Sequence, residues 1–93
     1  EAIETNVQSY KYAFSETLFR LPAKQKELLI AIAKEGNAKG ITSASFIGKH
    51  SLTSSSSVQA ALKGLLDKDF ITLEGDAYRV YDRFLAIWIN ENF

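Results

Sequence analysis

The sequence lacks cysteine and methionine entirely and has a single proline among its 93 residues. Without cysteine there is no disulfide framework and no thiolate metal site, which excludes a disulfide-stapled secreted mini-protein and fits a reducing cytoplasm. No apolar run approaches the ~20 residues of a membrane span, and no basic segment followed by an apolar one opens the chain, so we expect neither a membrane helix nor a signal peptide. The missing methionine suggests a piece cut from a longer protein.

An excess of charge of one sign is also lacking. The 11 Lys and Arg balance the 11 Asp and Glu, so the formal net charge is zero. Proteins that bind nucleic acid gain much of their affinity from Lys and Arg that displace counterions, and no segment of this chain is strongly basic. What the chain does have is 46% hydrophobic residues, which at this length predicts one small globular domain.

Hydrophobic periodicity predicts several helices. Apolar residues recur at steps of three and four over residues 3–21 and again over 23–35, where Pro22 opens the second helix. Gly36 ends that helix, and Ile41-Thr42 is long enough only for a stub of strand. A brief helix over residues 43–49 and a turn then lead to the most regular segment, 58–66, for which Thr53 or Ser54 is the expected N-cap.

From Phe70 the hydrophobic period changes to two, which predicts a β-hairpin with Glu74-Gly75-Asp76 at its tip. Asp82 then caps a last helix that runs to the C-terminus. A short helix, a tight turn, a longer amphipathic helix and a hairpin follow one another in the order of a winged helix-turn-helix. The predicted fold is therefore mainly α with a small β-hairpin (α+β), a winged helix-turn-helix preceded by an extra N-terminal helix.

We expect two parts in the chain: residues 1–21 as an N-terminal linking helix, and residues 22–93 as the winged helix-turn-helix domain with its C-terminal helix. The apolar positions of the predicted elements give the expected core. It consists of Leu28, Leu29, Ile32, Phe46, Ile47, Val58, Leu62, Leu65, Ile71, Tyr78, Val80, Phe84 and Trp88.

The helix that carries the regular segment 58–66 would be the recognition helix, because a helix-turn-helix offers the outward side of its second helix to a partner. Serine hydroxyls can approach phosphates, a glutamine can read an adenine edge, and Lys63 and a wing arginine could meet phosphates. The positions opposite the leucine stripe are Ser56, Ser57, Ala60, Lys63 and Gly64, with Ser55 in the first turn and Gln59 on the flank. The candidate nucleic-acid-binding residues are Ser55, Ser56, Gln59, Lys63 and Arg79.

The same residues have a plainer interpretation, in which the serines cap the helix and the others are solvated. Two carboxylates at the wing tip, Glu74 and Asp76, would repel a DNA backbone, and only Arg79, Lys49 and His50 are expected nearby to offset them. A protein-binding surface is the alternative to DNA. For it, we single out Tyr12 and Phe19 as candidate interface residues, since they lie off the main apolar stripe of the first helix.

The chain shows no residue pattern of an enzyme. Residues 36–40 lack the Gly-Lys-Ser/Thr ending of a phosphate loop and follow a helix, whereas such a loop follows a strand. A single histidine, His50, and no cysteine leave no metal-ligand spacing, and no nucleophile elbow accompanies the serines. We expect no catalytic residue, no metal and no cofactor in this chain. The aromatic residues of the hairpin and last helix could form a stacking platform for single-stranded nucleic acid, but their periodicity favours core packing.

Several short runs together resemble a known family. They are Leu21-Pro22-Ala23-Lys24-Gln25-Lys26-Glu27-Leu28-Leu29, Ile41-Thr42-Ser43, Ser55-Ser56-Ser57-Val58-Gln59-Ala60-Ala61-Leu62, Leu65-Leu66-Asp67-Lys68 and Tyr78-Arg79-Val80-Tyr81-Asp82-Arg83-Phe84-Leu85-Ala86-Ile87-Trp88. Over about residues 14–90 the chain resembles the C-terminal winged-helix region of prokaryotic AAA+-type ATP-binding proteins related to the archaeal ATPases.

This resemblance implies a cytoplasmic parent protein in which a P-loop ATPase domain precedes the winged-helix module. ATP and Mg would bind in that domain, outside this chain, so no Walker residue carries over. The module would bind double-stranded DNA, or it would serve as a lid or docking element for the ATPase domain or a partner protein. Asp82, in the Tyr-x-Val-x-Asp pattern, is expected to be a structural N-cap.

Overall fold

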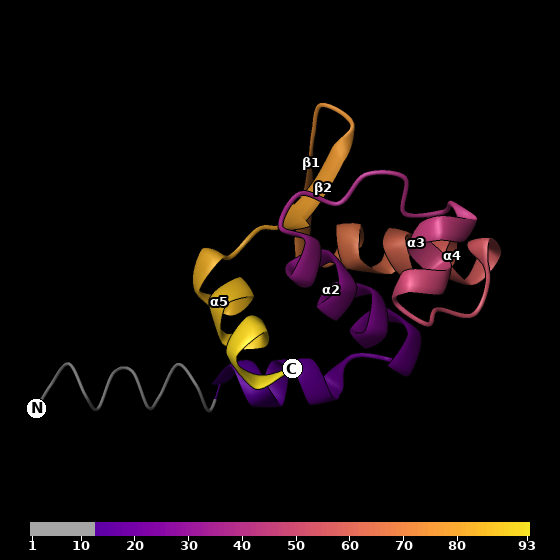
Figure 1. Cartoon of the computed structure of the whole chain (residues 1–93). Coiled ribbons are helices and arrows are strands. Elements are labelled where there is room, and N and C mark those ends of the chain that lie inside the picture. The colour runs from indigo at the N-terminus through magenta and orange to yellow at the C-terminus, as the bar shows by residue number, and fades with distance from the viewer. Residues whose placement is uncertain (1–12) are drawn as a thin grey trace, which may run out of the picture.

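The computed structural model describes residues 13–93 and shows a group of helices with a two-stranded hairpin projecting from it (Figure 1). Residues 13–20 are helical. The elements that follow are α2 (Ala23–Glu35), α3 (Ala44–Lys49), α4 (Ser55–Asp67), β1 (Ile71–Glu74), β2 (Ala77–Val80) and α5 (Arg83–Asn92). The predicted α+β winged helix-turn-helix is confirmed. The part of the first helix predicted over residues 3–12 lies outside the described residues.

Local side-chain chemistry sets the ends of the helices. Ser43, Ser54 and Asp82 stand at the N-caps of α3, α4 and α5, and each side chain accepts a hydrogen bond from a backbone N–H of the first turn. Of the two N-caps predicted for the recognition helix, Ser54 is therefore the one used. At the other end of α2, Gly36 has a φ of 78°, a left-handed conformation that glycine adopts without strain.

Helix α2 is the centre of the fold, since it contacts α4, α5 and β2. Its inner side carries Leu28, Leu29 and Ile32, all essentially inaccessible to solvent. The residues before it also contribute to the core, because Leu18 in the first helix and Leu21 just after it are buried. The division of the chain at residues 21 and 22 stays a prediction.

Most of the predicted core residues are buried, but Phe84 is not. Its side chain is 70% exposed, whereas Leu85 and Ile89 are buried against the rest of the core. Helix α5 packs against α2 with Leu85 and Ile89 on its inner side, and at helical spacing Phe84 then lies on the outside. Four other predicted core residues are only partly buried, packed against the core: Ile47, Leu62, Tyr78 and Trp88.

The wing consists of β1 and β2, which pair antiparallel with Ile71 opposite Val80 and Glu74 opposite Ala77. The stub of strand predicted at Ile41-Thr42 is wrong. The backbone that pairs with the wing belongs instead to Ala38, whose N–H donates to the Tyr78 carbonyl at 2.7 Å while the Tyr78 N–H donates to the Ala38 carbonyl at 2.9 Å.

Candidate recognition surface

The outward face of α4 gathers the four candidate residues that the sequence placed on the recognition helix. Val58, Ala61 and Leu65 are buried, and this fixes which side of the helix faces solvent. The residues on the solvent side are Ser55, Ser56, Gln59 and Lys63, all exposed and within about 100° of arc at helical spacing. They lie together, as predicted, and among them Ser56 shares a 3.3 Å hydrogen bond between its hydroxyl and that of Ser54.

Two residues predicted on that outward face are placed differently. Ser57 is partly buried, and its N–H donates to the Ser54 hydroxyl. Gly64 faces α2: a Cβ built on it would lie 2.7 Å from Cδ of Gln25, which is closer than side chains pack. The glycine thus allows α2 and α4 to approach each other closely, and it belongs to the helix interface rather than to the recognition surface.

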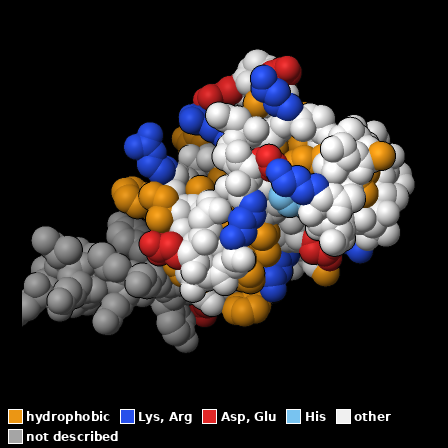
Figure 2. Space-filling model, in the orientation of Figure 1, with side chains coloured by type: hydrophobic (Ala, Val, Ile, Leu, Met, Phe, Trp, Pro, Cys, Tyr) orange, Lys and Arg blue, Asp and Glu red, His pale blue; other side chains and the backbone are white. Residues whose placement is uncertain are grey.

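The charges of the wing are neutralised within the domain. Arg79 Nη2 lies 2.8 Å from Glu74 Oε2, and Lys39 Nζ lies 3.7 Å from Asp76 Oδ1, with all four side chains exposed. Arg79, the candidate wing contact for nucleic acid, therefore has a carboxylate partner on the neighbouring strand. Figure 2 shows acidic and basic side chains mixed at the top of the molecule, where Figure 1 places the wing.

Two residues expected to offset the wing carboxylates are engaged elsewhere. Lys49 Nζ and His50 Nε2 lie 2.8 and 2.7 Å from the same oxygen, Oε2 of Glu35. The hydrogen bond from Lys49, followed by that from His50, lowers the pKa of the Glu35 carboxyl below its ordinary value of 4.5. This cluster ties the end of α3 to the end of α2, so neither Lys49 nor His50 is directed at the wing carboxylates.

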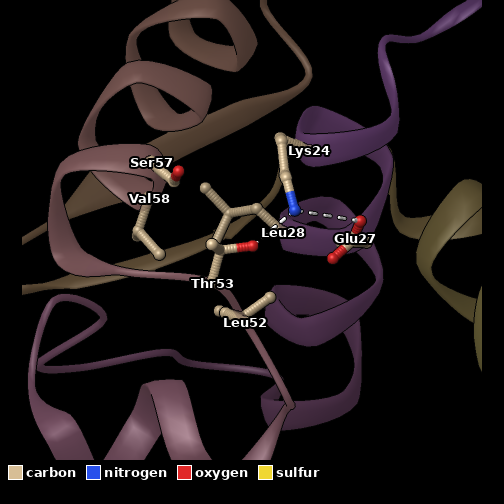
Figure 3. A pocket seen from close by; sticks show the side chains of 7 residues that line it. All are labelled: Lys24, Glu27, Leu28, Leu52, Thr53, Ser57 and Val58. Carbon is tan, nitrogen blue, oxygen red and sulfur yellow. Dashed lines mark hydrogen bonds and ion pairs between the residues drawn. The ribbon is translucent and has the colours of Figure 1, made fainter.

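A small hollow lies between the start of α2 and the start of α4 (Figure 3). Lys24 spans its mouth, with hydrogen bonding to the Thr53 hydroxyl and an ion pair to Glu27 at 4.0 Å. The hollow has about 200 Å³ of unfilled space, part of it open to solvent. Ligand sites usually occupy ~300–1,000 Å³, so this hollow is smaller than a typical ligand site. Its lining consists of Lys24, Glu27, Leu28, Leu52, Thr53, Ser57 and Val58.

The helix-turn-helix, the paired wing and its bridge to Ala38 agree with the result of a comparison with family models. Residues 12–91 match the family described as "Probable winged helix domain". The chain belongs to this family. No curated protein and no solved structure matches it. Membership supports a DNA-binding or regulatory module of a kind that is generally non-catalytic, while the attachment to an ATP-binding domain stays a prediction.

Of the two interface candidates in the first helix of this winged-helix domain, Tyr12 lies outside the described residues. Phe19 is 70% exposed, and the Lys26 ammonium lies 4.7 Å from the centre of its ring. The Lys26 ammonium therefore lies over one face of the ring, while most of the Phe19 side chain stays accessible to solvent.

The aromatic residues considered as a stacking platform for nucleic acid do not form one continuous exposed surface. Trp88 is partly buried and contacts Phe14 and Phe93, with ring centres 6.2 and 6.1 Å apart. Tyr78 is also partly buried, and Phe84 lies on the outer side of α5. Within residues 13–93, no three potential metal-ligating side chains come together, and no helix has the length and apolar content to cross a membrane.

Proposed function

We propose that this winged-helix domain is a non-catalytic regulatory module that acts by docking on protein. The observation that carries the proposal is how little unpaired positive charge the recognition surface has: Arg79 and Lys39 pair with the wing carboxylates, and among the four candidate residues of the outward α4 face only Lys63 is a cation. The resemblance to the winged-helix regions of AAA+-type proteins supports a partner in the same cytoplasmic protein, a preceding domain that binds ATP and Mg.

Charge makes duplex DNA the weaker candidate. The logarithm of a DNA affinity falls with the logarithm of salt concentration by about 0.9 for each phosphate that is neutralised. Lys63 and Arg79 together would give a slope of about −2, whereas proteins held on DNA by 6–10 phosphate contacts have slopes several times steeper. Arg79 would, in addition, have to leave Glu74 before it could contact a phosphate.

Phe19 supplies the contact for protein docking. Its ring is accessible, and it lies on the helix that the sequence predicts to link this domain to the preceding one. Protein interfaces bury apolar and aromatic side chains at their centre and surround them with polar groups. The Phe19 ring suits the centre of such an interface, and the Lys26 ammonium over it suits the polar surround. Docking would cover Phe19 and leave the outward face of α4 uncovered.

The test compares amide hydrogen exchange and side-chain labelling in the domain alone and in the protein that includes the preceding region. We expect residues 13–20 to become protected and F19A to abolish that protection. F84A is the matched control, since Phe84 has the same exposed fraction of 70% but lies on α5. Unchanged protection of residues 13–20, or an equal effect of F84A, would refute the docking proposal.

DNA binding is the second candidate, favoured by the four residues gathered on the outward face of α4. Titration of duplex DNA at low and moderate salt separates the two functions. Binding with a steep salt slope that K63A reduces by about one would establish the DNA function. Absence of binding, or binding without a salt slope, would eliminate it.

A further inference from the structure

The outer side of α5 carries a stripe with a cation at one end, apolar side chains in the middle and a carboxylate at the other end. Arg83, Phe84, Ile87 and Glu91 lie within about 100° of arc at helical spacing, opposite the buried Leu85 and Ile89. Phe84 is 70% exposed and Ile87 49%. On the left of Figure 2, where Figure 1 places α5, basic, hydrophobic and acidic side chains follow one another.

The two charged residues of this stripe are placed unfavourably with respect to the helix dipole. A helix favours carboxylates in its first turn and cations in its last, but α5 begins with Arg83 and has Glu91 next to its last residue. Neither side chain forms an ion pair within residues 13–93. The described part of the chain therefore offers no local reason for this arrangement of charge.

A second copy of the same helix would explain why the cation and the carboxylate lie at these ends of α5. Arg83 and Glu91 each lie four residues from Ile87, so the stripe is complementary to itself when two copies run antiparallel. Ile87 then faces the partner's Ile87, Phe84 covers the contact on either side, and each Arg83 meets the partner's Glu91. This is the self-complementary pattern that a two-fold symmetric interface requires.

We propose that the outer face of α5 is a homodimer interface, formed by antiparallel packing of two copies around Ile87. The proposal goes beyond the docking function, which uses Phe19 on a different helix. An experiment can therefore refute the dimer without refuting protein docking, and the reverse. The Tyr81 side chain, just before α5, is 72% exposed and lines an open hollow together with Arg79 and Arg83.

The size of the face sets the strength of the dimer. The ten residues of α5 span ~15 Å, so one helix face buries less than the ~800 Å² per partner of a standard interface. The dimer therefore falls among weak, transient associations. It should become visible by sedimentation equilibrium as the chain is concentrated from ~10 μM to ~1 mM.

Charge reversal gives the sharpest test. R83E places two carboxylates opposite each other at both ends of the interface, and E91R places two cations there. We expect either change to weaken the dimer about tenfold, since it replaces two ion pairs by two repulsions. The double variant, R83E with E91R, restores both pairs with exchanged signs and should return the dissociation constant to within about threefold of the original.

The apolar centre has a matched control. I87E should leave the chain monomeric at the highest concentration, whereas L73E should not, although Leu73 on the wing is exposed to nearly the same degree, 50% against 49%. F84A should weaken the dimer and F19A leave it unchanged, the reverse of their expected effects on protein docking.

A second readout excludes misfolding as the cause. Because R83E and E91R each bring a charge into agreement with the helix dipole, both should raise the melting temperature of the dilute monomer while weakening the dimer. The wild-type chain remaining monomeric at ~1 mM would overturn the proposal. Failure of the double reversal to restore association, or equal effects of I87E and L73E, would also overturn it.

Discussion

Replacement of Gly64 by alanine tests how closely α2 and α4 approach each other. Glycine in a helix interior costs about 1 kcal/mol relative to alanine, so G64A should gain that amount from the helix itself. The new Cβ would lie 2.7 Å from Cδ and 3.2 Å from Oε1 of Gln25, both at the movable end of that side chain. Gln25 must therefore swing away and give up the 2.8 Å hydrogen bond that its Oε1 accepts from Lys68.

The two effects are similar in size. An exposed hydrogen bond of this kind is worth ~0.5–1 kcal/mol, so G64A alone should change the free energy of unfolding by less than about 0.5 kcal/mol. In a Q25A background the three atoms nearest to the new Cβ are gone, and G64A should then stabilise the domain by about 1 kcal/mol, or by ~4–8 °C in melting temperature.

Urea denaturation followed by circular dichroism measures both values. G48A is the matched control, since Gly48 is a helical glycine with no atom within 4 Å of its would-be Cβ. It should stabilise the domain whether or not Gln25 is present. If G64A in the Q25A background destabilised the domain, the obstruction would be the backbone of α2, and the assignment of the close contact to the end of the Gln25 side chain would be wrong.

The cap of α5 and the Glu35 cluster give two further predictions. D82A should lower the free energy of unfolding by about 1 kcal/mol, because the N–H groups of Phe84 and Leu85 lose their acceptor. D82N should retain most of the stability, since asparagine also caps helices. An equal loss of stability in thermal melts of the two variants would contradict the capping role. The pKa of Glu35 is lowered in the folded chain, so its contribution to stability is present above the ordinary value of 4.5 and is lost as the pH falls through the folded pKa. Denaturation curves at successive pH values should therefore show a shallower loss of stability for E35Q than for the wild type in that acidic range, and parallel curves would show that the hydrogen bonds from Lys49 and His50 contribute nothing.

The elements of the fold could be read from local patterns in the sequence. The helix predicted over 23–35, the hairpin and the cap at Asp82 all depend on residues close together in the chain, and the structure confirms each of them. Phe84 was misplaced because the last helix has an apolar stripe wider than the side that packs. Periodicity locates such a stripe, but the packing against α2 decides which edge of it is buried.

Contacts between residues that are far apart in the chain could not be predicted from the sequence. Ala38 is small and lies in a loop, so nothing local indicates that it bridges to Tyr78. The pairing of Glu35 with Lys49 and His50 likewise depends on how α3 sits on α2. On the recognition surface, the exposed positions of α4 could be predicted from the helical period of its apolar residues. The place of Gly64 in the interface with α2 could not, because it depends on which helix packs against that side of α4.

The bridge between Ala38 and Tyr78 has a consequence for the order in which the chain folds. The hairpin of β1 and β2 closes through a tight turn, so it can form early, but the bridge encloses α3, α4 and β1 and must wait until those elements have docked. In refolding experiments with pulsed hydrogen exchange, the amides of Ala38 and Tyr78 should gain protection after those of α2. The attachment of the wing would then mark the completion of the native state.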